Sequence, residues 1–255
     1  MIPVSPDTTV RVANSERATL KLDVDTEVDG ATVKPRFGGE LALAVDGNEL
    51  DFPLMEAPNF ARIDWESGGQ KVFTTYAEVV SKHYFKLGDL KGYGDGQDDF
   101  ADMADEVLFM ARQAATEVFE QNARRSFVHR VGRTKDYGRG GMLQLWHCDV
   151  YELLTGGYRL VSDAQAERDG MLPQPFPVFV EYLYGADDMP AQVSRAVLEL
   201  AAYMLRPTNR PVGATGESSD AGYIHFTTAG MDGATDIPEV NAAIQQFGRE
   251  VQCVW

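Results

Sequence analysis

The sequence predicts an α+β protein, built from a small helical bundle with β-hairpin insertions and an N-terminal β module. Three observations support this fold class. Apolar residues of segment 102–127 recur at steps of three and four, a second pattern of this kind over residues 191–205 directly follows Pro190, and the first 65 residues contain short runs of alternating polarity. With 255 residues, of which 44% are hydrophobic, the chain is long enough to bury a core.

The longest predicted helix covers residues 102–127. One apolar stripe runs along it: Met103, Val107, Met110, Ala114 and Val118. A second apolar set flanks this stripe: Leu108, Ala111, Ala115 and Phe119. Because this surface is broader than a single docking face needs, we expect the helix in the centre of a bundle or at a subunit interface. Arg124 and Arg125 follow near its end, where cations are favoured.

Residues 1–75 are predicted to form the N-terminal β module, and residues 76–255 a second, helical domain. Strands are expected over residues 18–24 and 40–54, with Asp46-Gly47-Asn48 as a turn inside the second segment. Residues 70–76 look extended, residues 76–87 look helical, and the glycines and aspartates of residues 88–99 predict a loop.

Strands and helices also alternate in the second half of the chain. Strands are predicted over residues 127–137, 142–154, 177–183 and 223–228, with a glycine-rich loop over 208–222. The buried face of helix 191–205 is predicted to consist of Val193, Val197, Leu200, Ala201 and Met204. A last helix covers residues 237–247, with Asp236 as its N-cap and Pro238 in its first turn.

The formal net charge of −16 argues against a protein whose main task is to bind nucleic acid phosphates. The N-terminus lacks the features of a signal peptide, and no apolar run approaches the length of a membrane-spanning helix. We therefore expect a protein that is made in the cytoplasm and stays there. Cys148 and Cys253 are then expected to be reduced.

The sequence gives no clear signature of a cofactor or a metal. Asp95, Gln97, Asp99 and Glu106 have the spacing of a calcium-binding loop, but Phe100 occupies the position that requires glycine. The three acidic residues among them are better explained as favourable charges near the N-terminus of the following helix.

His147-Cys148-Asp149 is the other candidate for chemistry. Neighbouring residues of a strand point to opposite faces, so these three side chains cannot all reach one ion. A structural role is favoured, and no nucleophile elbow or nucleotide-binding loop occurs elsewhere. We predict a protein that is not an enzyme, with a hydrolase that uses Cys148 or His147 as the alternative.

Six cations lie within sixteen residues: Arg124, Arg125, Arg130, Arg133, Lys135 and Arg139. This cluster can face nucleic acid or an acidic partner, or it can be a solvated strand face that balances the acidic N-terminal half. In a chain this acidic, pairing between neighbouring copies of the protein is a third interpretation, and we prefer it.

The order of these segments resembles the head-tail connector, or neck adaptor, proteins of tailed bacteriophages. A long helix ends at Arg125-Ser126-Phe127 and leads into strands, segment 178–205 runs from a strand through a proline into a helix, and Ile237-Pro238-Glu239-Val240 precedes the last helix. The resemblance covers roughly residues 76–248. The N-terminal β module departs from the short members of that family, so it is either an outward decoration or a contact with a further tail or capsid component.

The resemblance implies a structural virion protein of the head-tail neck, made in the bacterial host cytoplasm. It would form a homo-oligomeric ring, commonly of twelve subunits, that docks beneath the portal protein, supports the next neck, stopper or tail protein, and lets DNA pass through its channel without specific binding. No cofactor and no membrane is implied. A stopper or tail terminator is the alternative, but such proteins are more purely β.

The resemblance also suggests where partners bind. The expected subunit interface consists of Met103, Val107, Met110, Arg124, Arg125 and Arg130. The expected portal interface lies in segment 237–255 and consists of Ile237, Pro238, Val240, Phe247 and Trp255. Aromatic residues such as Trp255 are frequent anchors of interfaces.

Overall fold

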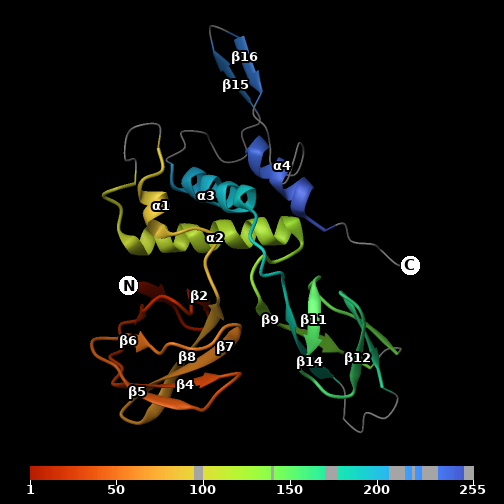
Figure 1. Cartoon of the computed structure of the whole chain (residues 1–255). Helices are drawn as coiled ribbons and strands as arrows, with labels where there is room; N and C mark the ends of the chain where they lie inside the picture. The colour runs from red at the N-terminus through yellow and green to blue at the C-terminus, as the bar shows by residue number, and fades with distance from the viewer. Residues whose placement is uncertain are drawn as a thin grey trace. The chain divides into compact units, whose positions relative to one another are not determined.

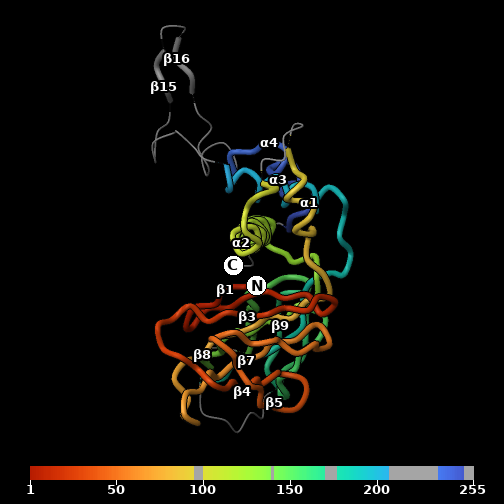
Figure 2. The backbone as a smooth tube through the Cα atoms, turned by 90° about the vertical axis from the view of Figure 1, so that its left-hand side faces the viewer, coloured from red at the N-terminus to blue at the C-terminus, as the bar shows by residue number. Residues whose placement is uncertain are grey.

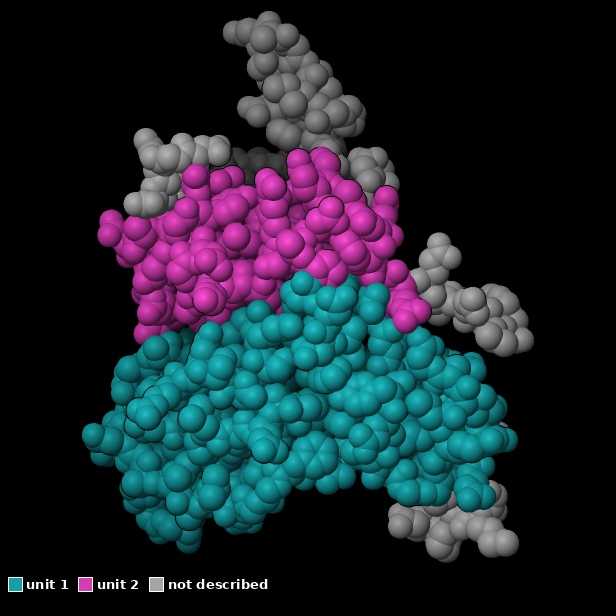
Figure 3. Space-filling view, viewed as in Figure 1, with its two compact units in different colours: residues 1–83, 125–189 teal, residues 84–124, 190–255 magenta. Residues whose placement is uncertain are grey.

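The computed structural model describes residues 1–94, 100–138, 141–169, 177–206 and 235–249, and the backbone of strands β15 (Gly216–Ser219) and β16 (Gly222–His225) (Figure 1). Two compact units are present (Figure 3). One combines Met1–His83 with Arg125–Met189, and the other combines Tyr84–Arg124 with Pro190–Trp255. The α+β class predicted from the sequence is confirmed. The domain boundary suggested at residues 75 and 76 falls within strand β8 (Gln70–Val80).

A five-stranded sheet forms the N-terminal part of the first unit. Its strand order is β2 (Thr9–Ala13), β8, β7 (Asn59–Ser67), β4 (Gly30–Pro35) and β5 (Leu41–Ala44). The neighbouring strands are antiparallel except for the parallel pair β2 and β8. Val33, Ile63 and Trp65 are fully buried on this sheet. The outer strands are β2 and β5.

A second sheet in this unit has the order β1 (Ile2–Val4), β3 (Ala18–Leu22) and β6 (Glu49–Phe52). The turn predicted at residues 46–48 is confirmed: Gly47 and Asn48 have φ values of 57° and 64°, and Asp46 and Glu49 exchange two backbone hydrogen bonds. The strands on either side of this turn nevertheless join different sheets, because β5 pairs with β4 and β6 pairs with β3.

Two smaller sheets complete the first unit. One has the order β11 (Val150–Leu153), β14 (Val178–Tyr184) and β9 (Arg130–Asp136), and the other has the order β10 (Met142–Gln144), β13 (Gln165–Arg168) and β12 (Tyr158–Ser162). The single strand predicted over residues 142–154 is wrong, because the chain turns at Asp149, whose φ is 57°, and continues in another sheet.

The second unit contains helices α1 (Leu87–Lys91), α2 (Asp105–Ala123), α3 (Ala191–Leu205) and α4 (Pro238–Phe247). Helix α3 packs against α2 and α4 (Figures 1 and 2). Helix α2 is shorter at both ends than the predicted segment 102–127 and is followed by Arg124, which adopts the left-handed conformation. Helix α3 has the bounds that the sequence predicts.

Four further details of the helices differ from the prediction. Residues 76–80 continue β8 instead of forming a helix, and α1 lies partly in the predicted loop 88–99. Both faces of this part of β8 are covered, since the consecutive residues Ala77, Glu78, Val79 and Val80 are all buried, and the alternation typical of a half-exposed strand is therefore absent. In α3, Met204 is exposed, and in α4 the N-cap is Ile237 instead of Asp236.

The substitution Gly185→Ala tests the close packing at the end of β14. Gly185 has a φ of 97°, and a Cβ atom there would lie 2.2 Å from the carbonyl oxygen of Val128. We expect this variant to lose roughly 3 kcal/mol of unfolding free energy in a denaturant titration, because both the left-handed backbone and the overlap are unfavourable. Gly39→Ala is the matched control, since a Cβ there meets nothing within 4 Å. Equal stability of the two variants would contradict this account.

Candidate interaction surfaces

Helix α2 buries the apolar set that flanks the first stripe, and not the first stripe itself. Its buried residues include Leu108, Ala111, Ala115 and Phe119. Val107 and Met110 of the first stripe are 48% and 49% exposed, Ala114 is exposed, and Met103 is partly buried. The helix therefore has a fully packed face and an apolar exposed face.

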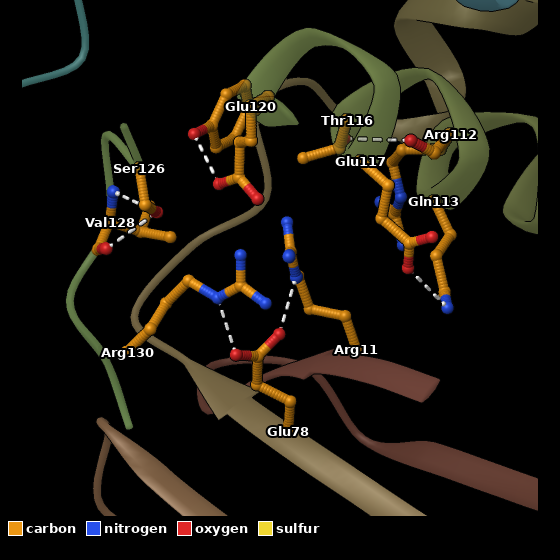
Figure 4. A network of polar contacts seen from close by, with 11 residues as sticks. Arg11, Glu78, Arg112, Gln113, Thr116, Glu117, Glu120, Ser126, Val128 and Arg130 are labelled. Atoms are coloured by element: carbon orange, nitrogen blue, oxygen red, sulfur yellow. Dashed lines mark hydrogen bonds and ion pairs between the residues drawn. The ribbon is translucent and has the colours of Figure 1, made fainter. Parts of the chain in front are cut away.

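The buried face of α2 also carries polar groups. Glu120 accepts a hydrogen bond of 2.6 Å from the Tyr84 hydroxyl, and Arg112 donates one to the Phe85 carbonyl (Glu120 and Arg112 are drawn in Figure 4). These contacts hold the segment around α1 onto α2, within the second unit. They explain why charged residues occur on the packed face of this helix.

The arginines predicted at a subunit interface have different environments. Arg124 is exposed at the end of α2. Arg125 forms an ion pair with Asp149, at 3.0 Å, and its guanidinium lies over the Phe127 ring. Arg130 is bound to Glu78 within the same unit, so that only Arg124 of the three presents its charge fully to solvent.

The residues predicted to contact a portal also differ in their exposure. Ile237 and Val240 are buried within the second unit, where α4 packs on α3 and α2. Pro238 is exposed and Phe247 is partly exposed. Trp255 lies outside the described residues, as does Cys253.

The first unit contains a buried carboxylate at its centre. Glu78 of β8 accepts hydrogen bonds from Arg11 of β2, at 2.9 Å, and from Arg130 of β9, at 2.5 Å (Figure 4). Burial acts to raise the pKa of Glu78, but the charges of Arg130 and Arg11 outweigh it and lower this pKa to about 2. Since the three residues come from three separate parts of the chain, this contact joins the five-stranded sheet to the segment that follows α2.

A second buried carboxylate, Asp136, lies at the end of β9. It accepts hydrogen bonds from the Gly138 backbone, from the Tyr158 hydroxyl at 2.8 Å and from the Arg168 guanidinium. Burial and the hydrogen bond to Asp136 raise the pKa of Tyr158 to about 12. This contact links β9 to β12 and β13, and both carboxylates thus stabilise the first unit.

His147 lies beside two tyrosines of β14. Its Nδ1 atom is 2.8 Å from the Tyr182 hydroxyl, which is 2.9 Å from Thr134 Oγ1, and its ring stacks on Tyr184 at 4.0 Å between centroids. Burial raises the pKa of Tyr182. The side chains of Tyr182 and Tyr184 belong to a hydrophobic cluster with Leu145 and Val150, so a structural role accounts for this histidine.

The outer face of the β9 and β14 pair carries cations between exposed rings. Arg133 lies over the Phe179 ring at 4.5 Å, and Lys135 lies over both Tyr137, at 5.1 Å, and Phe179, at 5.7 Å. Phe179 is 48% exposed and Tyr137 61%. We call these four residues, Arg133, Lys135, Tyr137 and Phe179, the basic-aromatic strip. The sequence indicated its cations but not its rings, of which Phe179 comes from a strand more than forty residues further along the chain.

Two negative findings apply to the described part of the chain. It contains no group of three or more histidines, cysteines, aspartates or glutamates placed to hold a metal ion. None of its helices combines the length and the apolar character needed to cross a membrane. Three of the four residues that have the spacing of a calcium-binding loop, Asp95, Gln97 and Asp99, lie outside the described residues.

Comparison with known proteins finds structural likeness but no match in sequence. No family model and no curated protein matches the sequence. Among solved structures, the chain is similar to a component of the "Virion of native gene transfer agent (GTA) particle", with 21% sequence identity, a TM-score of 0.41, and coverage of 66% of this chain and 90% of that one. No function follows from similarity at this level.

The substitution Glu78→Gln tests the buried carboxylate. At pH 7 we expect the variant to lose about 3 kcal/mol of unfolding free energy, because it leaves two arginines without their charged partner. The folded-state pKa of Glu78 is lowered from 4.5 to about 2, so its stabilising contribution is present above pH 4.5 and is lost as the pH falls towards 2. The difference in unfolding free energy between the wild-type protein and the Glu78→Gln variant should therefore disappear as the pH falls from 4.5 towards 2.

The control for this measurement is Glu49→Gln. Glu49 pairs with Lys21 at 3.1 Å, but both side chains are substantially exposed, so we expect a loss below about 1 kcal/mol. A stability gap for Glu78→Gln that stays constant between pH 5 and pH 2 would contradict the assignment of the lowered pKa.

Proposed function

We propose that this chain is a structural virion protein, a head-to-tail adaptor that forms a ring beneath a phage portal and continues the DNA channel. Support comes from the order of its elements, because α2, β9, β14, α3 and α4 follow one another as in the family that the sequence resembles. Pro190 separates β14 from α3 at the expected position.

The observation that carries this proposal is the exposed apolar face of α2. Val107 and Met110 are each about half exposed, one turn apart, on a helix whose other face is fully packed. An apolar face of this kind suits lateral packing between identical subunits, and head-to-tail contacts close into a ring when the rotation between subunits allows it. We assign Met103, Val107, Met110 and Arg124 to this subunit interface, whereas Arg125 and Arg130 act within their own subunit.

For docking to a portal we propose the exposed side of α4 and the segment that follows it. Ile237 and Val240 hold α4 to its own unit, so that Pro238 and Phe247 are the members of the predicted set that remain accessible on the described surface. Trp255 stays a prediction for the same interface.

The mechanism of such an adaptor is geometric, with no bond-making step. In a ring of subunits that each carry a net charge of −16, the channel surface would repel DNA phosphates. DNA would therefore pass without specific binding, since tight phosphate contacts would slow its movement.

The mass of the purified chain, alone and after mixing with portal protein of the same virus, tests this proposal. We expect native mass spectrometry to find either a ring or a monomer that joins the portal stoichiometrically. Met110→Asp should weaken ring formation, because a carboxylate would be buried in an apolar contact. Leu54→Asp is the matched control, since Leu54 is 62% exposed and lies outside the assigned interface.

A chain that stays monomeric and ignores the portal would contradict the adaptor role. Equal assembly of the Met110→Asp and Leu54→Asp variants would contradict the assigned α2 interface alone.

A further inference from the structure

The basic-aromatic strip presents cations that lack an acidic partner in the described part of the chain. No described carboxylate forms an ion pair with Arg133 or Lys135. Glu181 is paired across the strands with Arg133, but its carboxylate is bound by Arg36 at 2.7 Å. The strip is therefore a local positive surface on a strongly acidic protein.

This surface is also held in place. Arg133, Lys135 and Phe179 are on the outward face of the β9 and β14 pair, while Gly132, Thr134 and Val180 alternate with them on the buried face. The rings of Phe179 and Tyr137 limit the positions that the two cations adopt. Cations that are ordered before binding, beside exposed rings, are typical of a contact site.

The same unit presents a local negative surface in the connection between β3 and β4. Asp23, Asp25, Glu27 and Asp29 are exposed, and no basic residue lies among them. We call residues 23–29 the acidic loop. Among the described residues, no cation forms an ion pair with Asp23, Asp25 or Glu27.

Asn48 fixes the shape of the acidic loop. Its side-chain oxygen accepts a hydrogen bond from the Val28 backbone at 3.0 Å, and its amide group donates to the carbonyls of Val24 and Thr26. The loop is thus ordered before any partner binds, which lowers the entropic cost of binding.

The acidic loop and the basic-aromatic strip lie beyond opposite ends of strand β4. Asp29, just before β4, accepts a hydrogen bond from Gly68 in the turn between β7 and β8. Arg36, just after β4, binds Glu181 of β14. Six residues of strand separate the two ends by about 20 Å, so the surfaces cannot satisfy each other within one chain.

We propose that the acidic loop of one copy binds the basic-aromatic strip of the next copy. Two different, complementary surfaces that lie apart on one unit form a head-to-tail contact, which is the type of contact from which rings are made. The inference rests on the proposed function and names a subunit contact of the ring in addition to α2. A nucleic acid is less well matched to this surface, because the net charge of −16 repels phosphates.

Two charge-reversed variants of the full chain test this contact. Arg133→Glu with Lys135→Glu reverses the strip, and Asp25→Lys with Glu27→Lys reverses the loop. We expect each variant alone to raise the dissociation constant of self-association by about tenfold or more, measured by sedimentation velocity, because like charges then face each other. For a chain that assembles only on portal protein, the same variants are measured in that complex.

Mixing the two variants gives the sharpest result. The acidic loop of the strip variant matches the unchanged strip of the loop variant, and the reversed loop of the loop variant matches the reversed strip of the strip variant. A mixture should therefore assemble, with the two variants alternating, although each variant alone does not. A chain that carries all four substitutions should associate with itself again. Arg17→Glu with Arg195→Glu changes the net charge by the same amount as the strip variant, at two exposed sites, and is the matched control for that variant.

Several outcomes would overturn the inference. Normal assembly of the strip variant alone, or a mixture of the two variants that does not assemble, would exclude this contact while the adaptor role stands. Unchanged self-association with lost binding of a single-stranded oligonucleotide would make the strip a nucleic acid surface. A wild-type chain that never assembles, with or without portal protein, would reject both the inference and the proposed function.

Discussion

A buried carboxylate that must be paired sets the architecture of the first unit. Glu78 is enclosed between the guanidinium groups of Arg11 and Arg130, which come from β2 and from β9. Since an unpaired charge is costly in a protein interior, the segment after α2 has to return to the N-terminal sheet for Glu78 to be satisfied. Arg36 with Glu181 and Lys82 with Asp187 add further ion pairs between the same two parts of the chain. The first unit is therefore discontinuous in sequence.

Local sequence patterns predicted where most helices and strands lie, but not which other parts of the chain they contact. Helix α3 and strands β3, β9 and β14 lie where periodicity and proline position place them, because each has one face in contact with a core. The end of β8 resembles a helix in its sequence pattern, since a strand that is buried on both faces has no alternation of polar and apolar residues. A glutamate inside the apolar run Tyr76–Val80 is the signal that could have revealed a buried ion pair there.

The candidate surfaces were predictable only in part, for a related reason. Both apolar sets of α2 are visible in the sequence, but which of the two faces the core depends on α3 and α4, and local spacing does not contain that information. The basic cluster was visible as a run of charges, yet Arg125 and Arg130 are engaged by Asp149 and Glu78. Only long-range contacts decide which cations of such a run stay available.

Strand β5 has a consequence for how the protein behaves in concentrated solution. It is an outer strand of the five-stranded sheet, and its Leu41 is 40% exposed. Uncovered outer strands are templates for edge-to-edge aggregation. Here the apolar strand is flanked by Glu40 and Asp46, both exposed, so two antiparallel copies brought edge to edge would place carboxylates against carboxylates. The carboxylates at the two ends of β5 therefore disfavour edge-to-edge association of this outer strand.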